Sequence, residues 1–269
     1  MINKKLALIA GNGDFPFLFL NEVKSKEENV IVIALKGETD HEIDNCGFPV
    51  FWQNIGKLNK IIKIMKDNNV THAILCGQVI HTKLFTEVHL DLRAIKFLGS
   101  LVNKKTDSIL GALAAEFLKE GVEMISSVTY MESWMPTDKG VITKTKVIDK
   151  VVKDIEFGYD TAKKIAGLDI GQTVVVKDNA VIAVESLEGT DQCILRGFSL
   201  AGKGCVVVKV NKPNQDMRFD VPVLGRRTFE ILKDVEAAAI CFEAGKTLFF
   251  DREECLKIAQ KNKIVVYAI

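Results

Sequence analysis

The first half of the chain alternates short apolar runs with segments of helical periodicity, and this alternation constrains the fold more than any other feature. Three runs have the length and composition of buried strands: residues 6–10, 30–35 and 71–76. Strands that are buried on both faces and joined by helices form parallel sheets. The first half therefore predicts a doubly wound, Rossmann-like α/β domain.

Helical patterns occupy the segments between and after these runs. Residues 17–25 and 57–68 are expected to form helices, because apolar residues recur on one helical face of the latter. A further helix is expected over residues 108–120, followed by a short strand at 122–125.

Residues 131–146 interrupt this pattern with Pro136, Gly140 and many polar side chains. We interpret the stretch as a linker between an N-terminal domain, residues 1–130, and a C-terminal catalytic domain of mixed α/β type, residues 147–269. The second half is expected to contain a helix at 147–167, a hairpin turning at Asp178–Asn179, a helix after Gly189, strands at 205–210, 237–242, 247–250 and 264–268, and a helix beginning at Asp251.

Charge and composition exclude several classes of function. The 36 basic and 35 acidic residues leave a net charge of +1, whereas nucleic-acid binders normally carry a basic excess, so no nucleic-acid partner is expected. The six cysteines show no metal-finger spacing and lie mostly in apolar runs, which is typical of reduced thiols. No signal peptide and no apolar stretch of roughly 18 residues is present, so we expect a soluble, cytoplasmic protein.

The sequence LALIAGNGDFP places a glycine-rich turn directly after the first expected strand. Gly11 and Gly13 match the first two glycines of the dinucleotide fingerprint G-x-G-x-x-G, but Pro16 replaces the third. Three interpretations stay open: a phosphate or nucleotide bound by backbone N–H groups, a tight turn that requires glycine, and NAD binding by an oxidoreductase. Gly77 and Gln78 should lie beside this turn, at the carboxyl end of a neighbouring strand, where such sheets bind ligands.

The segment QDMRFDVP, residues 215–222, alternates charged and apolar side chains. As an extended strand it would place Asp216, Arg218 and Asp220 on one face. Carboxylates supply the oxygen ligands that divalent cations such as Mg²⁺ prefer, and an arginine between them can form paired hydrogen bonds with phosphate. The alternative is a solvated strand whose charges are paired across the sheet.

The segment VESLEGTDQ, residues 184–192, predicts a strand that ends in a turn at Gly189 before a helix. Thr190 or Asp191 is placed to cap that helix. Glu185, Glu188 and Asp191 also gather carboxylates near the helix N-terminus, where a magnesium ion could bridge a diphosphate. Metal binding and simple capping both remain open.

The remaining chemistry is limited by the motifs that the sequence lacks. It contains no G-x-S-x-G, Walker A or HExxH motif, and its four histidines show no metal-ligand spacing. Lys209 and Lys212 could neutralise phosphates, although isolated lysines usually only solvate a surface. An inventory of carboxylates, cations and backbone amides fits hydrolysis of a phosphoanhydride.

Five segments together resemble a known family: IAGNGDFP, CGQV, VESLEGTDQ, KVNKPNQDMRFDVPVLG and AGKTLFFDREECLKIAQKNKIVVYAI. The chain is similar, from residue 6 to 269, to the I-type UDP-2,3-diacylglucosamine pyrophosphatases of lipid A biosynthesis in Gram-negative bacteria. The resemblance implies an Mg²⁺-dependent hydrolase that converts UDP-2,3-diacylglucosamine to UMP and 2,3-diacylglucosamine 1-phosphate (lipid X). It also implies a lipid-linked nucleotide-sugar substrate and transient contact with the inner face of the membrane, and it leaves a homodimer open.

The resemblance assigns roles to individual residues. The family's essential aspartate matches Asp220, with Asp216 the next candidate, and the implied Mg²⁺ ligands are Asp220, Asp216, Glu188 and Asp191. The implied substrate-binding residues are Gly11, Gly13, Gly77, Gln78, Thr190, Gln192, Lys209, Lys212 and Arg218. Where the family tends to carry paired aspartates, this chain has Thr106–Asp107, which puts a role for that loop in doubt.

One amphipathic stretch, residues 84–102, has two interpretations. Its apolar side chains fit ordinary core, but they also fit a wall for acyl chains, which are costly to expose at about 0.8 kcal/mol per CH₂ group. The alternative function, from another class, is a non-catalytic sensor that binds a nucleotide sugar through Gly11, Gly13, Gly77 and Gln78.

Overall fold

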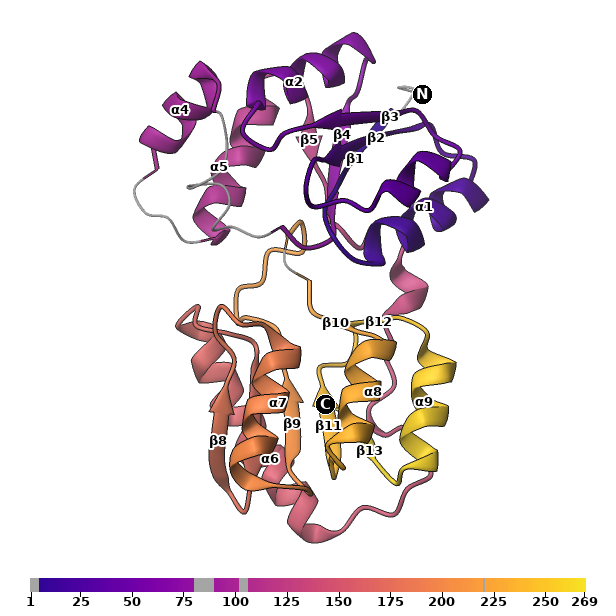
Figure 1. Cartoon of the computed structure of the whole chain (residues 1–269), viewed down its shortest axis with the longest axis vertical. Helices are drawn as coiled ribbons and strands as arrows, with labels where there is room; N and C mark the ends of the chain where they lie inside the picture. Colours follow the sequence, from indigo (N-terminus) through magenta and orange to yellow (C-terminus); the bar gives the residue numbers. More distant parts are fainter. Residues whose placement is uncertain (1–4, 80–89, 102–105, 220) are drawn as a thin grey trace. The chain divides into compact units, whose positions relative to one another are not determined.

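The structure is a computed structural model that describes residues 5–79, 90–101, 106–219 and 221–269 (Figure 1). The chain divides into two compact units. Unit 1 comprises Met1–Met131 and Met217–Phe219, and unit 2 comprises Glu132–Asp216 and Asp220–Ile269. Each unit has its own β-sheet and its own hydrophobic core.

Strands and helices alternate along unit 1, as Figure 1 shows. Its elements are β1 (Leu6–Ala10), α1 (Phe15–Ser25), β2 (Val30–Leu35), η1 (His41–Asn45), β3 (Val50–Gln53), α2 (Leu58–Asp67), β4 (His72–Cys76), α4 (Leu92–Gly99), α5 (Thr106–Leu118) and β5 (Glu123–Met124). The strands form a parallel sheet in the order β3-β2-β1-β4-β5. The prediction of a doubly wound parallel sheet is confirmed.

Helices cover the sheet of unit 1 because its central strands are apolar on both faces. β1 and β2 are buried along their whole length. Ile9 and Ile31 pack in one cluster with residues of α2, α4 and α5. Neighbouring residues of a strand point to the opposite face, and α1, which contacts β4, buries Phe19 completely.

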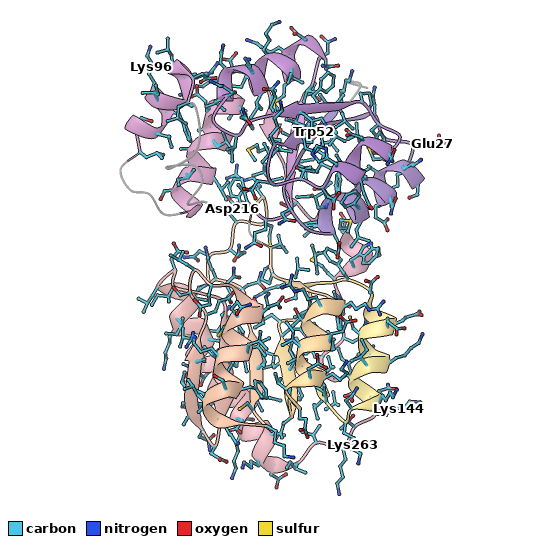
Figure 2. All side chains as sticks on the ribbon, in the orientation of Figure 1. Glu27, Trp52, Lys96, Lys144, Asp216 and Lys263 are labelled. Carbon is cyan, nitrogen blue, oxygen red and sulfur yellow. The ribbon has the colours of Figure 1, made fainter. Side chains whose placement is uncertain are left out.

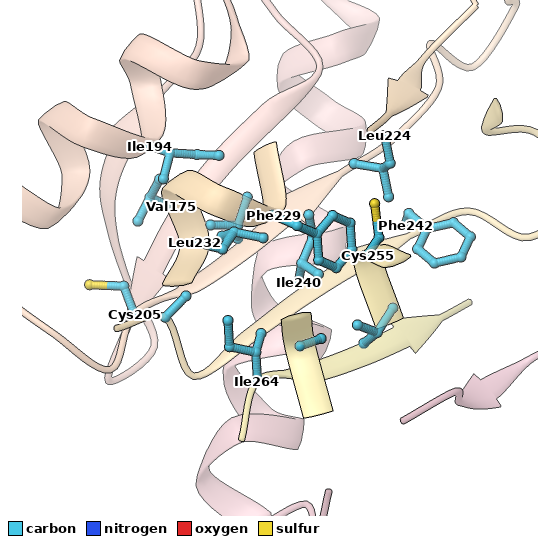
Figure 3. Close-up of a cluster of buried hydrophobic side chains, with 14 of the residues drawn as sticks. Val175, Ile194, Cys205, Leu224, Phe229, Leu232, Ile240, Phe242, Cys255 and Ile264 are labelled. Atoms are coloured by element: carbon cyan, nitrogen blue, oxygen red, sulfur yellow. The ribbon is translucent and has the colours of Figure 1, made fainter. Parts of the chain in front are cut away.

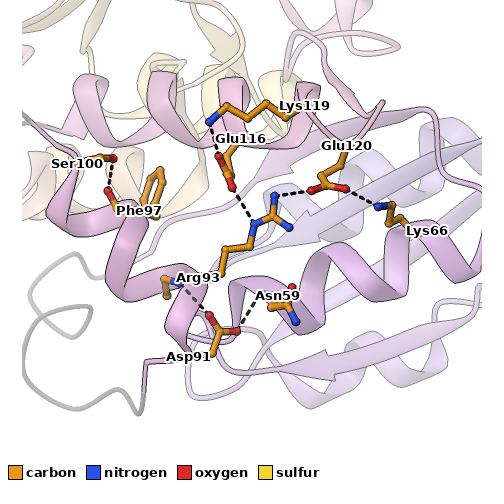
Figure 4. A network of polar contacts seen from close by, with 10 residues as sticks. Asn59, Lys66, Asp91, Arg93, Phe97, Ser100, Glu116, Lys119 and Glu120 are labelled. Carbon is orange, nitrogen blue, oxygen red and sulfur yellow. Dashed lines mark hydrogen bonds and ion pairs between the residues drawn. The ribbon is translucent and has the colours of Figure 1, made fainter.

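A network of ion pairs joins α4 to α5 and α2 (Figure 4). The guanidinium of Arg93 donates from Nε to Glu116 at 2.7 Å and from a terminal nitrogen to Glu120 at 2.6 Å. Glu120 also pairs with Lys66 of α2. Asp91 caps α4 by accepting the N–H of Ala94 at 2.8 Å. The short helix α4 is therefore held to its neighbours at several points.

The amphipathic stretch at 84–102 is only partly described, because residues 84–89 and 102 lie outside the described residues. Within α4, Leu92 is 80% exposed and Ile95 is 52% exposed, whereas Phe97 packs against the core of unit 1. The stretch therefore contributes both core and exposed apolar surface.

Unit 2 begins within the residues that we expected as a linker. Its elements are η2 (Glu132–Trp134), β6 (Gly140–Val141), α6 (Asp149–Gly167), β7 (Thr173–Lys177), β8 (Ala180–Val184), α7 (Thr190–Ala201), β9 (Val206–Lys209), β10 (Val223–Leu224), α8 (Arg226–Asp234), β11 (Ala239–Phe242), β12 (Leu248–Phe249), α9 (Arg252–Lys261) and β13 (Val265–Ala268). β6 pairs with β13, so residues 140–141 are part of the second sheet.

The main sheet of unit 2 is mixed, in the order β6-β13-β11-β9-β7-β8. β9, β11 and β13 run parallel, whereas β7 is antiparallel to both β8 and β9. Helix α6 packs on one face, and α7, α8 and α9 pack on the other, where Ile194, Phe229 and Cys255 join one core cluster (Figure 3). None of the helices in the described parts of the chain is long and apolar enough to cross a membrane.

The segment around Arg218 differs from the expected strand. Met217 and Arg218 form a turn, and Phe219 lies in a bend, so the prediction of an extended strand over 215–222 is wrong. Phe219 is 3% exposed and belongs to the core cluster of unit 1. Residues 217–219 therefore belong to no strand, and the ring of Phe219 is buried in the core of unit 1.

Backbone hydrogen bonds hold the same segment to unit 1. Ser127 donates its N–H to the carbonyl oxygen of Met217 at 3.0 Å and its hydroxyl to that of Arg218 at 2.7 Å. The guanidinium of Arg218 lies over the ring of Phe219, 5.0 Å from its centre.

Candidate functional site

Polar side chains of unit 2 gather where β9 ends and α7 begins. Lys209, the last residue of β9, donates from Nζ to Oγ1 of Thr190 at 2.9 Å, and Thr190 donates to Glu185 at 2.9 Å. Gly189 is the N-cap of α7, and no described side chain accepts a hydrogen bond from this helix end. Unpaired N–H groups of a first helical turn beside a lysine ammonium are suited to binding an anion.

The capping role expected for Thr190 or Asp191 is not what the structure shows. Thr190 is the first residue of the helix, and its hydroxyl is engaged with Glu185 and Lys209. Asp191 turns instead to the start of α8, where it pairs with Nε of Arg227 at 2.9 Å. The prediction of a side-chain cap is therefore wrong, and glycine takes the capping position. Gln192, next in the first turn, is exposed.

Two of the three carboxylates around this turn, Glu188 and Asp191, are paired with arginines, whereas Glu185 accepts hydrogen bonds from Thr190 and from the backbone N–H of Gln172. Oε1 of Glu188 accepts a hydrogen bond from Arg196 at 2.5 Å, and this bond lowers the pKa of Glu188. Asp191 accepts a hydrogen bond from the hydroxyl of Thr228 at 3.2 Å in addition to its pairing with Arg227.

A Mg²⁺ ion does not fit the described carboxylates alone. Glu188 and Asp191, two of the four proposed ligands, are neutralised by arginines that would compete with a cation. Asp220, a third proposed ligand, lies outside the described residues. No group of three or more His, Cys, Asp or Glu side chains in the described parts of the chain could hold a metal ion.

The segment after β9 carries the other proposed site residues of unit 2. Lys212 pairs through Nζ with Asp169 at 2.7 Å, so its charge is shared with a neighbouring carboxylate. Its backbone N–H donates to the side chain of Gln215 at 3.2 Å, which closes a short turn. Asp216, labelled in Figure 2, directly follows this turn.

A buried ion pair that we did not predict lies at the start of this segment. Glu243 directly follows β11, is 3% exposed, and pairs with Nζ of Lys163 from α6 at 3.0 Å. It also accepts the backbone N–H of Asn211 at 2.6 Å. Burial alone would raise the pKa of this carboxyl, but the hydrogen bond from Asn211 and the ammonium of Lys163 outweigh burial and lower it.

The sequence contained a signal for Glu243 but none for its pairing with Lys163. Glu243 comes directly after an apolar run, the same position relative to its strand that drew attention to Gly11 and Gly77. The partner lysine could not have been found in this way, because Lys163 lies within a helix that carries many other lysines.

The two glycine loops of unit 1 lie side by side, as expected. Asn12 and Gln78 form an isolated antiparallel bridge, with N–H to carbonyl distances of 2.8 and 2.9 Å. A Cβ atom on Gly11 would lie 2.6 Å from the carbonyl oxygen of Gln78, and one on Gly77 would lie 2.7 Å from that of Asn12. The close approach of the loops therefore accounts for both glycines, whether or not a ligand binds there.

Comparison with known proteins covers both units. The family model described as LpxI N-terminal domain matches residues 5–134, and the one described as LpxI C-terminal domain matches residues 138–267. The chain belongs to the LpxI family. This assignment confirms the resemblance found in the sequence.

A relative of known name supports the same assignment. UDP-2,3-diacylglucosamine pyrophosphatase LpxI of Caulobacter vibrioides is 30% identical over 278 residues, which cover 99% of this chain and 98% of the relative. Membership of the LpxI family supports the prediction of a diphosphatase enzyme.

Proposed function

We propose that the chain hydrolyses the pyrophosphate bond of UDP-2,3-diacylglucosamine to UMP and 2,3-diacylglucosamine 1-phosphate. The name of the Caulobacter vibrioides relative and its match over nearly the whole of both chains support this substrate. In the proposed reaction water adds to one phosphorus, and the bond from that phosphorus to the bridging oxygen breaks.

One observation on the chain itself carries the proposal: the uncapped N-terminus of α7 beside Lys209 and Thr190. A diphosphate is a compact anion that matches helix N–H groups and an ammonium. Charge that develops on its oxygens during hydrolysis would be stabilised by the same donors. The arrangement therefore suits binding and reaction of a phosphoanhydride.

We propose Asp220 as the main catalytic carboxylate and Asp216 as its neighbour, on the resemblance in sequence. The expectation that Mg²⁺ serves the reaction also stays a prediction. If the ion binds, it supplies positive charge to the diphosphate, and we propose Asp216 and Asp220 as ligands on the resemblance in sequence.

The substrate carries two acyl chains, so we expect the reaction to take place at the inner face of the membrane, with the protein in the cytoplasm. The exposed Leu92 and Ile95 of α4 are the apolar side chains that we propose for contact with acyl chains. Flotation of the protein with vesicles that contain the substrate tests this location.

Product analysis tests the activity directly. Purified protein is incubated with UDP-2,3-diacylglucosamine in ¹⁸O-labelled water, with Mg²⁺ or with EDTA, and phosphorus products are followed by NMR and mass spectrometry. Release of UMP and lipid X is expected, and the label identifies the phosphorus that water attacks. Saturable binding without any turnover would instead support a nucleotide-sugar sensor.

A matched pair of lysine variants tests the anion site at α7. Lys209→Met should weaken binding of UMP or inorganic phosphate about tenfold, the size expected for one charge-assisted contact of about 1.4 kcal/mol. Lys203→Met removes an exposed lysine that pairs with Glu236 in the same unit and should leave binding unchanged. Equal affinities for the two variants would remove Lys209 from the site.

A further inference from the structure

The buried ion pair between Lys163 and Glu243 contacts the backbone on both sides of one residue. Glu243 accepts the N–H of Asn211 at 2.6 Å, and Nζ of Lys163 donates to the carbonyl oxygen of Asn211 at 2.8 Å. The same ammonium donates to both carboxylate oxygens of Glu243, at 3.1 and 3.0 Å. A single ion pair therefore satisfies both backbone groups of Asn211.

Within the part of the chain that the structure describes, Asn211 has no other anchor of this kind. Its side chain is 1% exposed, and neither its amide nitrogen nor its amide oxygen has a hydrogen-bond partner among the described residues. Buried polar atoms without hydrogen-bond partners cost free energy, and they do not fix the position of a residue. The position of Asn211 thus depends on the two backbone bonds to Lys163 and Glu243.

Asn211 is also where the chain leaves the rigid sheet for the segment that carries Lys212 and Asp216. β9 ends at Lys209, and residues 210–216 contain no helix or strand. A displacement at the first residue of such a segment is passed on to the residues after it. Proposed catalytic groups need to be held within about 0.5 Å of the productive geometry.

We propose that Glu243 and Lys163 are positioning residues, which fix the segment 211–216 for catalysis through the backbone of Asn211. The inference rests on the proposed function for its catalytic consequence, because Asp216 is a proposed catalytic residue. Its structural part, the restraint on the segment, stands independently. The carboxylate of Glu243 also accepts a hydrogen bond from the hydroxyl of Tyr159 at 3.2 Å and pairs with Nζ of the half-exposed Lys246 at 3.4 Å.

The chain offers a close control for this ion pair. Asp154 lies on the same helix α6, is 2% exposed, and accepts backbone N–H groups of Asp178 and Asn179 at 3.2 and 2.6 Å. These residues form the turn between β7 and β8, at the amino end of β9, away from Asn211. Asp154→Asn and Glu243→Gln therefore remove the same charge from equally buried carboxylates that hold different loops.

The experiment compares Glu243→Gln, Lys163→Met, Lys163→Arg and Asp154→Asn in the full chain. Amide hydrogen exchange should become about tenfold faster or more at residues 211, 212 and 214–216 in Glu243→Gln and Lys163→Met, but only at the 178–179 turn in Asp154→Asn. The kcat should fall about 100-fold in the first two variants, the size of a misplacement of about 1 Å, with KM changed less than about threefold. Lys163→Arg keeps the charge and should restore kcat to within about tenfold of the natural protein.

The outcomes separate this inference from the proposed function. Unchanged exchange at 211–216 in both Glu243→Gln and Lys163→Met overturns the inference. The inference is also overturned if the natural protein is active and Glu243→Gln and Lys163→Met have the same kcat as Asp154→Asn. If the natural protein hydrolyses no UDP-2,3-diacylglucosamine, the proposed function fails, and faster exchange at 211–216 still supports the restraint. Should Glu243→Gln fail to fold, Lys163→Met gives the same test from the other side of the ion pair.

Discussion

At the scale of single residues, the glycines of unit 1 show how a structural requirement can resemble a binding motif. Gly77 has a φ of 94° and a neighbouring carbonyl oxygen 2.7 Å from the place of its missing Cβ. Gly13 has a φ of 90°, but nothing lies within 4 Å of the same place. The two glycines therefore share a positive φ near 90° and differ in the space around the place of the missing Cβ.

This difference gives a prediction for alanine variants. Gly77→Ala should lower the free energy of unfolding by about 2–4 kcal/mol, because strain and a clash with Asn12 both apply. Gly13→Ala should lower it by about 1–2 kcal/mol, from backbone strain alone. Urea unfolding measures both. An equal loss of unfolding free energy in the two variants would mean that the clash with Asn12 adds nothing to the backbone strain.

The proposed catalytic residue gives a second prediction at this scale. Asp220→Ala should lower kcat by about three orders of magnitude, the size of losing one strong electrostatic contact in a transition state. Substrate affinity should change little, because the anion site at α7 is built from other residues. Near-normal turnover would transfer the chemistry to Asp216 or to the turn at Gly189.

At the scale of elements, glycines also set how closely helices pack on the sheet of unit 2. A Cβ on Gly197 of α7 would lie 2.8 Å from side-chain atoms of Val175, and one on Gly158 of α6 would lie 2.7 Å from Val208. Both helices thus approach their strands more closely than alanine allows, whereas Gly111 of α5 has open space around it.

The packing predicts opposite effects for the same substitution. Gly197→Ala should destabilise the protein by about 1–3 kcal/mol, since overpacking outweighs the better helix propensity of alanine. Gly111→Ala should stabilise it by about 0.5–1 kcal/mol, from helix propensity alone. Thermal unfolding of the two variants measures these changes. A Gly197→Ala variant that is as stable as the natural protein would contradict the packing argument.

The ion pairs between α4, α5 and α2 predict a local sensitivity to acid. Hydrogen bonds from Lys66 and then Arg93 lower the pKa of Glu120 from its usual 4.5 to about 2, and hydrogen bonds from Lys119 and Arg93 lower that of Glu116. A carboxyl with a lowered pKa in the folded state stabilises that state above its unfolded pKa. This stabilisation should therefore be complete above about pH 4.5 and should be lost as the pH falls towards 2.

Hydrogen exchange of α4 and α5 between pH 2.5 and 6, corrected for the intrinsic rate, measures this loss. Glu120→Gln should flatten the pH dependence, because glutamine does not titrate. An unchanged slope in that variant would show that other carboxyls, such as Glu243 with its lowered pKa, dominate the acid response.

The sequence predicted the strongly patterned elements and missed the weakly patterned ones. β1 and β2 were found because they are uninterrupted apolar runs. β3 was missed because its four residues are only half-buried, and α8 was missed because five of its nine residues are charged. Asp216, Arg218 and Asp220 were expected on one strand face, but the period-two pattern came from a turn that buries Phe219. Contacts between distant segments, such as Lys163 with Glu243, have no local signature.

At the scale of the whole molecule, each of the two units is built from two separate segments of the chain. It leaves unit 1 after Met131, returns at Met217–Phe219, and then continues in unit 2. Phe219 supplies a buried aromatic ring to a core that is otherwise formed by the first 124 residues.

This return predicts a long-range effect of one substitution. Phe219→Ala should destabilise unit 1 by about 3–5 kcal/mol, the usual loss for a buried phenylalanine. Hydrogen exchange should quicken in β1, β2 and β4, although the changed residue lies in the second half of the chain. The exchange of β9 and β11 serves as the internal control, and equal changes in those strands would contradict the assignment of Phe219 to unit 1.

The return of the chain to unit 1 also limits whether recombination between genes can separate the two units. A recombination event at the boundary after Met131 would give a new partner to a first half that lacks Phe219. The same break made by a protease would leave two fragments that still share one core, so the nicked protein should stay together until it is denatured. We therefore expect that unit 1 is not transferred to other proteins by recombination without the second half of the chain, and that the two halves of the gene are inherited together.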